Sequence, residues 1–251
     1  MSPDPVSRLH AREHWFESDL GRHVLRAERA AVDDKLAQLY GFHLMQIGVS
    51  RQVSLFEHSM IRHKFALAQL PGGQGISALA EAEQLPIESD SVDVVLLHHV
   101  LEYSQNPHQL LREASRVVVP HGHLLIVGFN PWSLFGVRCV LARRFAQPIW
   151  HSSLLSARRL TDWLGLLDFA VDDVQFRCHA PPLNHAATLS RLAPLDRWGE
   201  SWSLPGGSVY LVHARKQIRP LTMIRAPRRL APRRLSALPL ATPRARGTTL
   251  H

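Results

Sequence analysis

Cysteine is scarce in this chain of 251 residues: only Cys139 and Cys178 occur, without CxxC spacing. Their scarcity excludes a disulfide framework and a cysteine-based zinc site, and it favours a reducing compartment. No apolar run approaches the roughly 18 residues that a transmembrane helix needs, so we expect no membrane span. The N-terminus lacks the basic flank and apolar core of a secretory signal, and we therefore expect a cytoplasmic protein.

Acidic residues are missing from the end of the chain. All 21 Asp and Glu precede Arg215, whereas ten Lys and Arg lie between Arg215 and His251. Before Arg215, 19 basic against 21 acidic residues give a net charge of −2, while the tail carries +10. Five prolines follow from Pro220 onward, so we expect a disordered tail. It either solubilises the protein or binds nucleic acid or another acidic partner.

One stretch in the middle of the chain alternates strand and helix patterns. Asp93 opens an apolar run that ends at Leu97, and a second apolar run extends from Leu124 to Phe129. Between them Pro107 begins a segment with apolar residues at helical spacing, at a position where its missing N–H needs no partner. Two apolar strands joined by a helix form a βαβ unit, which predicts a parallel sheet buried on both faces.

The same stretch resembles a known family. Five short segments occur in the order and spacing of the class I S-adenosylmethionine (SAM)-dependent methyltransferases: Leu85–Ile87, Ser91–Asp93, His99–Glu102, Leu111–Glu113 and Arg116–Val117. They are most similar to the type 11-like subgroup, which acts on small molecules and includes quinone-ring methyltransferases. The resemblance implies an α/β, Rossmann-like fold: a seven-stranded, mostly parallel sheet with helices on both faces and an antiparallel last strand.

Hydrophobic periodicity predicts the remaining organisation. After a disordered start at residues 1–12, a helix is expected from His14 to Leu39, ended by Gly41. The other expected elements are strands at 43–47, 65–69 and 76–80, a partly helical insertion at 131–145, a helix capped by Ser156 and running through 167, a strand at 170–178, a short helix at 186–192 and a strand at 209–212. We divide the chain into an N-terminal extension and helix (1–39), a methyltransferase-like domain (40–217) and a basic tail (218–251).

The resemblance implies that SAM is held at three places. The first is a glycine-rich turn after the first strand, represented by Gln46 and Gly48, where the family's other glycines are absent. The second is an acidic residue after the second strand, where Gln69 stands instead. The third is an acidic residue followed by an apolar one near the adenine, here Glu81 and Ala82. Each of these residues also has a purely structural interpretation. Gly48 would only end a strand, Gln69 would be a polar surface residue, and Glu81 would be a solvated loop carboxylate.

Two histidines follow the strand that ends at Leu97. Ligands of open parallel sheets bind beyond the carboxyl ends of the strands, so His98 and His99 lie near the expected site, and His98 is also a candidate cofactor contact. Either could be a catalytic general base, because imidazole titrates near neutral pH. Alternatively, one packs against the cofactor and the other hydrogen-bonds in the wall. We expect no metal site here, because adjacent side chains on an extended chain diverge. Glu102 is expected either to have a role in the site or to accept backbone N–H groups.

Aromatic residues follow the next strand. Trp132, Phe135 and Trp150 would either line an apolar pocket for a methyl acceptor or cover the core beneath the insertion.

The sequence leaves several functions open. One is methyl transfer from SAM to a small organic acceptor, in which the protein mainly aligns the nucleophile with the methyl group. Another is a degenerate relative with weak or no SAM binding that serves as a binding or scaffold module. A third is nucleic-acid modification assisted by the tail, although Leu97–Val100 lacks the Asn-Pro-Pro-Tyr-type signature of amino-group methylases. The oligomeric state and the acceptor are not indicated.

Overall fold

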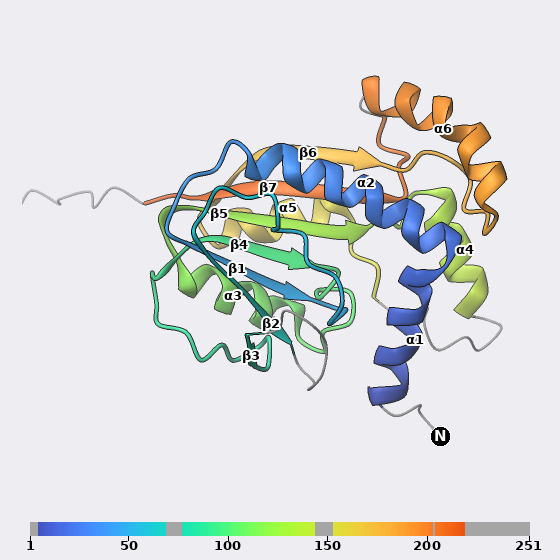
Figure 1. Cartoon of the computed structure of the whole chain (residues 1–251). Coiled ribbons are helices and arrows are strands. Elements are labelled where there is room, and N and C mark those ends of the chain that lie inside the picture. The colour runs from blue at the N-terminus through green and yellow to red at the C-terminus, as the bar shows by residue number, and fades with distance from the viewer. Residues whose placement is uncertain (1–4, 69–76, 144–152, 203, 219–251) are drawn as a thin grey trace, which may run out of the picture. The chain divides into compact units, whose positions relative to one another are not determined.

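The computed structural model describes residues 5–68, 77–143, 153–202 and 204–218 (Figure 1). Its helices are α1 (Pro5–Glu17), α2 (Asp19–Leu36), α3 (Pro107–Val117), α4 (Leu134–Arg143), α5 (Ala157–Leu166) and α6 (Ala186–Ser201). Its strands are β1 (His43–Gly48), β2 (His63–Ala68), β3 (Ala78–Leu79), β4 (Val92–His98), β5 (Val118–Phe129), β6 (Phe169–Arg177) and β7 (Val209–Lys216). Gln69, Trp150 and the basic tail lie outside the described residues.

The seven strands form one sheet in the order β3-β2-β1-β4-β5-β7-β6. Strands β1 to β5 pair in parallel, and β7 runs antiparallel to both β5 and β6. This arrangement confirms the predicted Rossmann-like α/β fold and the β4–α3–β5 unit. We call the edge at which β1, β4 and β5 end, with Gly48, His98 and Phe129, the carboxyl edge, and the opposite edge the amino edge.

Helices cover both faces of the sheet, as predicted (Figure 1). On one face α2 packs Ala31, Val32 and Leu36 against alternate residues of β1, β4 and β5. On the other face α3 and α5 pack against the remaining alternate residues, which explains why these strands are apolar at almost every position. No helix of the part described here is both long and apolar enough to cross a membrane.

The N-terminal helix differs from its prediction. One helix was expected over 14–39 after a disordered start, but α1 already begins at Pro5 and a break at Ser18 separates it from α2. Ser18 Oγ accepts a hydrogen bond from the Gly21 N–H at 3.0 Å and donates to Trp15 O at 2.7 Å, so this side chain caps the second helix. A Cβ on Gly21 would lie 2.1 Å from Trp15 O, so only glycine permits this tight junction.

The connection between β1 and β2 contains no helix. Parallel neighbours are usually joined through a helical crossover, but residues 49–62 cross as an irregular segment. Val53, Leu55 and Ile61 are buried beside α2 and cover the same face of the sheet. The end of β1 therefore lacks the helix N-terminus that would offer N–H groups to an anionic ligand.

Other differences concern element lengths. β5 begins at Val118, well before the apolar run from Leu124, and a register shift between Val92 and Val94 of β4 accommodates the added residues. α6 extends to Ser201, well beyond the short helix predicted, and α4 lies within the expected insertion. Ser156 accepts from the Arg159 N–H and caps α5, which confirms that prediction.

Candidate functional site

The ends of β1 and β4 lie side by side at the carboxyl edge. Gly48 and His98, the last residues of the two strands, are direct partners in the sheet. A Cβ added to Gly48 would lie 3.4 Å from its nearest neighbours and 3.9 Å from His98 Nδ1, so the fold itself leaves room for a side chain. At Gly136 a Cβ would lie 2.3 Å from Pro131 O, and there the fold requires glycine. Packing alone therefore does not require glycine at position 48.

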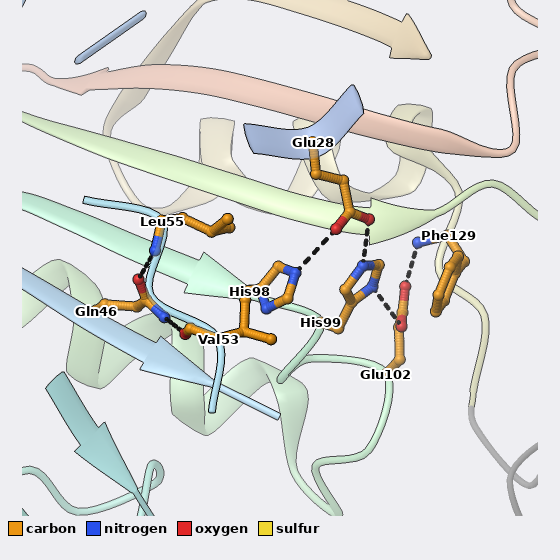
Figure 2. Close-up of polar contacts among 8 residues, drawn as sticks. All are labelled: Glu28, Gln46, Val53, Leu55, His98, His99, Glu102 and Phe129. Atoms are coloured by element: carbon orange, nitrogen blue, oxygen red, sulfur yellow. Dashed lines mark hydrogen bonds and ion pairs between the residues drawn. The ribbon is translucent and has the colours of Figure 1, made fainter. Parts of the chain in front are cut away.

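Glu28 of α2 brings a carboxylate to this edge. Its Oε2 accepts a hydrogen bond from His98 Nε2 at 3.1 Å, and its Oε1 accepts one from His99 Nε2 at 2.7 Å (Figure 2). All three residues are buried, with at most 2% of their surface exposed. A buried carboxylate is costly unless it is paired, and here each oxygen has an imidazole partner.

His99 reaches Glu28 because the chain leaves the strand in an unusual conformation. Its φ is 54°, in the left-handed region that non-glycine residues rarely adopt. The expectation that the two neighbouring histidines diverge is therefore wrong: their ring centroids lie 4.6 Å apart. Backbone strain of this kind concentrates at functional sites, which makes this junction a candidate.

Glu102 closes the other side of the network (Figure 2). Its Oε2 accepts a hydrogen bond from His99 Nδ1 at 3.1 Å, and its Oε1 accepts one from the backbone N–H of Phe129. The Phe129 ring stacks on His99 with 4.0 Å between centroids. Glu102 thus serves as a structural acceptor, one of its two expected roles, and ties the end of β4 to the end of β5. We call Glu28, His98, His99 and Glu102 the buried network.

Burial and charge oppose each other within the buried network. Burial disfavours the charged form of Glu28, but the two histidines outweigh it and lower the pKa of Glu28 to about 2. Burial likewise disfavours an imidazolium at His99, but Glu28 and Glu102 outweigh it and raise the pKa of His99 to about 10. At His98 burial dominates and lowers the pKa despite the hydrogen bond to Glu28. At neutral pH, His99 is therefore charged and His98 neutral.

The protonation states decide what each histidine can do. His99 donates both ring N–H groups to carboxylates, so it has no lone pair for a proton or a metal ion. Neutral His98 donates from Nε2 to Glu28, which makes its Nδ1 a hydrogen-bond acceptor. This Nδ1 is buried and has no partner in the structure. It lies 3.9 Å from the position that a Cβ on Gly48 would occupy. A buried acceptor without a donor calls for a partner, which a water molecule or a ligand group can supply.

Helix α1 covers this edge. Glu13, 5% exposed, accepts hydrogen bonds from Arg51 Nε and Nη2, both at 2.9 Å, and from the Arg51 backbone N–H at 3.2 Å. The hydrogen bonds from Arg51 lower the pKa of Glu13. Phe16 packs against both imidazoles, with centroids 5.6 Å from His98 and 6.0 Å from His99. Helix α1 thus covers both the turn after β1 and the two histidines at the end of β4.

The other predicted cofactor residues are dispersed. The Gln46 amide is fully used: its Nε2 donates to Val53 O at 2.6 Å and its Oε1 accepts from the Leu55 N–H at 2.9 Å (Figure 2). These bonds hold the irregular β1–β2 connection against the strand. Glu81 is exposed after β3, and Ala82 beside it is buried in the core.

The predicted aromatic pocket does not form among the described residues. Phe135 is fully buried and stacks on Phe129 at 4.7 Å, which is the core role that the sequence also allowed. Trp132 is 83% exposed. An open groove of about 1230 Å³ instead lies between α2 and α6, lined in part by Arg22, Arg26 and Arg197, and no residue of β1 or β4 lines it.

A second histidine cluster lies nearer the amino edge, six residues earlier in β5, or about 20 Å along the strand. His123 Nδ1 and His213 Nε2 are 3.0 Å apart, and a carboxylate oxygen of Asp172 lies within 4.8 Å of both. The register of β6 shifts between Val171 and Asp173, which places Asp172 in a bulge. Burial lowers the pKa of both histidines, so both imidazoles are neutral at neutral pH.

Known proteins share both the sequence pattern and the fold. A sequence profile described as a methyltransferase domain matches residues 43–126. The uncharacterized protein YafS of Escherichia coli (strain K12) is 32% identical over 216 residues, which cover 85% of this chain and 84% of that protein. The chain belongs to the class I SAM-dependent methyltransferase family. The demethylmenaquinone methyltransferase of Chlamydia pneumoniae is 26% identical over 113 residues, which cover 45% of this chain and 44% of that one.

A solved methyltransferase structure has the same architecture. The Thermotoga maritima protein described as a SAM-dependent methyltransferase, possible histamine N-methyltransferase, aligns with a TM-score of 0.59 at 18% identity, covering 82% of this chain and 94% of that one. At this identity the likeness shows the class I methyltransferase fold alone.

Sequence reasoning missed three residues of this candidate site: Glu13, Phe16 and Glu28. Glu28 carried a signal, because it falls in the buried stripe of α2 between Val24 and Ala31. A glutamate within an apolar helical stripe needs a buried partner, and that requirement could have pointed to the paired histidines.

Proposed function

We propose that this protein transfers a methyl group from SAM to a small organic acceptor, with the cofactor at the carboxyl edge between Gly48 and His98. The family membership supports the reaction class. The observation that carries the location is the unpartnered, buried Nδ1 of His98, 3.9 Å from the position that a Cβ on Gly48 would occupy.

The residues at this edge fit the chemical groups of SAM. The Nδ1 lone pair of neutral His98 suits the ammonium of the methionine end, which is a hydrogen-bond donor. Gly48 lets the backbone approach that end without a side chain. Glu81 offers a carboxylate to the adenine amino group, and the backbone N–H of Ala82 would reach the ring. Gln69 is the candidate for the ribose, without the charge that would strengthen the bond.

The chemistry assigns different roles to the two histidines. SAM supplies a methyl group already activated on a sulfonium, so the protein must mainly orient the acceptor and exclude water. His99, charged by its two carboxylates, cannot be a general base at neutral pH. His98 acts as a positioning residue, and Glu28 keeps its Nδ1 free by accepting from Nε2. The acceptor therefore needs no histidine base in this proposal.

A small organic acceptor is supported by one relative, which is named a demethylmenaquinone methyltransferase. The competing function is a scaffold that no longer binds SAM. It is favoured by the position of α1, which closes over the carboxyl edge through Glu13 and Phe16. Binding would require α1 to move, because both His98 and His99 are sealed beneath it.

Calorimetric titration of the full chain with SAM and with S-adenosylhomocysteine tests the proposal. Gly48→Ala should keep the fold, since the new Cβ makes only ordinary contacts, but should weaken binding at least about tenfold by filling the ligand space. Gly165→Ala on α5, where a Cβ meets nothing within 4 Å, is the matched control and should bind as the native chain does. Glu81→Ala should weaken binding about fivefold through one lost hydrogen bond.

No measurable heat with either compound would sink the proposal in favour of a scaffold. Binding that tolerates Gly48→Ala would instead place the cofactor elsewhere.

A further inference from the structure

Helix α4 exposes an apolar face. Four of its residues, Leu134, Val137, Val140 and Leu141, are 55 to 58% exposed, and Trp132 just before the helix is 83% exposed. These five residues are called the α4 face. The opposite side of the helix, with Phe135 and Cys139, is buried in the core. A helix that is apolar on both sides is normally covered on both, so among the described residues the α4 face lacks its cover.

Further exposed apolar groups lie on α6. Trp198 and Trp202 are 55% and 69% exposed. α4 and the segment before α6 touch, because Arg138 Nη1 donates to Pro182 O, and residues of both helices share one core cluster. Tryptophan is the residue most typical of the boundary between lipid and water. An apolar helix with exposed tryptophans suits that boundary.

The stretch of sequence that contains α4 carries charge of one sign. From Ala114 to Thr161 the chain contains no Asp or Glu. The segment after Phe129 carries five arginines in that interval, namely Arg138, Arg143, Arg144, Arg158 and Arg159. A region without acidic residues does not repel an anionic surface, and each arginine close to such a surface adds to the attraction. Residues 215–251, with +10, have the same preference.

We propose that the α4 face docks on a membrane surface that contains anionic phospholipids. The helix has 10 residues, too few to span a bilayer, so it lies in the headgroup region with the α4 face towards the acyl chains. Arg138, exposed on the same helix, contacts the phosphates. α4 begins five residues after Phe129, so docking brings the carboxyl edge of the sheet close to the lipid. This proposal does not depend on SAM binding.

The first test is co-sedimentation of the full chain with vesicles of phosphatidylcholine, with and without about 30% phosphatidylglycerol. The variant Leu134→Ser/Val137→Ser/Leu141→Ser should reduce binding to the anionic vesicles at least about tenfold, because three apolar side chains are lost from the contact. The matched control is Tyr40→Ser/Phe42→Ser/Met60→Ser, which removes side chains that are 77 to 79% exposed and lie outside α4. It should bind as the native chain does.

The second test separates docking of α4 from tethering by the basic tail. An environment-sensitive dye is attached at Val140→Cys or, as control, at Phe42→Cys; native Cys139 and Cys178 are buried and should not react. Anionic vesicles should shift the emission of the dye to the blue at position 140 and leave it unchanged at position 42.

Three results would overturn the proposal. The first is binding that survives the α4 triple substitution, and the second is co-sedimentation without a blue shift at position 140, as expected if the tail alone binds. The third is a native chain that ignores vesicles but sediments as a dimer, with the α4 variant monomeric. That outcome would make a second copy of the chain the occupant of the α4 face.

Discussion

Two histidine clusters in one sheet reach opposite charge states. In the buried network, α2 delivers Glu28 into the interior, and His99 becomes an imidazolium with a pKa of about 10. In the second cluster, Asp172 remains partly exposed, 3.6 Å from Arg215, and burial leaves His123 and His213 with lowered pKa values. Burial alone thus neutralises a histidine, and a charged one persists in the interior only where carboxylates are sealed in with it.

The largest expected effect is the loss of the sealed carboxylate. Glu28→Gln removes the buried carboxylate that pairs with both histidines, and we expect it to lower the free energy of unfolding by about 3 to 5 kcal/mol. Asp172→Asn in the second cluster should cost less than about 1 kcal/mol, because that carboxylate is partly solvated. Urea unfolding of both variants measures the difference, and equal losses would show that the two clusters do not differ as described.

A smaller effect is the response of stability to pH. The pKa of His99 rises from 6.5 to about 10 on folding, so its stabilisation is complete below pH 6.5 and is lost as the pH rises towards 10. The pKa of Glu28 falls from 4.5 to about 2, so its stabilisation is present above pH 4.5 and is lost as the pH falls towards 2. The stabilising contributions of Glu28 and His99 are therefore both fully present between about pH 4.5 and 6.5.

The second cluster should respond in the other direction. The pKa values of His123 and His213 are lowered on folding, so the folded state loses stability as the pH drops below 6.5. The variant His123→Gln/His213→Gln should therefore lose less stability than the native chain between pH 7 and pH 5. The buried His98, whose pKa is also lowered on folding, contributes the same loss of stability to the native chain and to the variant. Unfolding free energies at several pH values decide this, and parallel curves would contradict the contrast.

The smallest effect is expected outside both clusters. Deleting residues 220–251 should change the melting temperature by less than about 3 °C, because a segment rich in proline and free of acids has little apolar surface to bury. Retention on heparin should fall in the same deletion and weaken with salt in the full chain. A larger drop in melting temperature would mean that the tail packs on the body, and unchanged retention would place the anion-binding surface on the folded part.

Local sequence patterns were sufficient to predict the central strands and the starts of two helices. The apolar runs around Asp93–Leu97 and Leu124–Phe129 predicted β4 and β5, and Pro107 and Ser156 predicted the starts of α3 and α5, because propensity, periodicity and caps act within a few residues. The end of β4 also located His98 and His99 at the carboxyl edge. These features needed no knowledge of distant contacts.

The contents of the site depend on contacts across the chain. Glu28 lies 70 residues before His98, and Glu13 lies 38 residues before Arg51, so no short window contains either pair. The convergence of the two histidines depends on the left-handed φ of His99, which tertiary packing imposes against local preference. Gln46 reads as a candidate ligand until the irregular β1–β2 connection takes both ends of its amide.

The position of Glu28 near the start of the chain has a consequence for the order of folding. During synthesis α2 emerges first, but its carboxylate has no partner until His98 and His99 follow 70 and 71 residues later. Phe129, whose ring stacks on His99, emerges later still. The carboxylate of Glu28 is therefore made early and paired late, after β4 has been made. Until then, α2 carries an unpaired carboxylate within the apolar stripe that the folded protein buries.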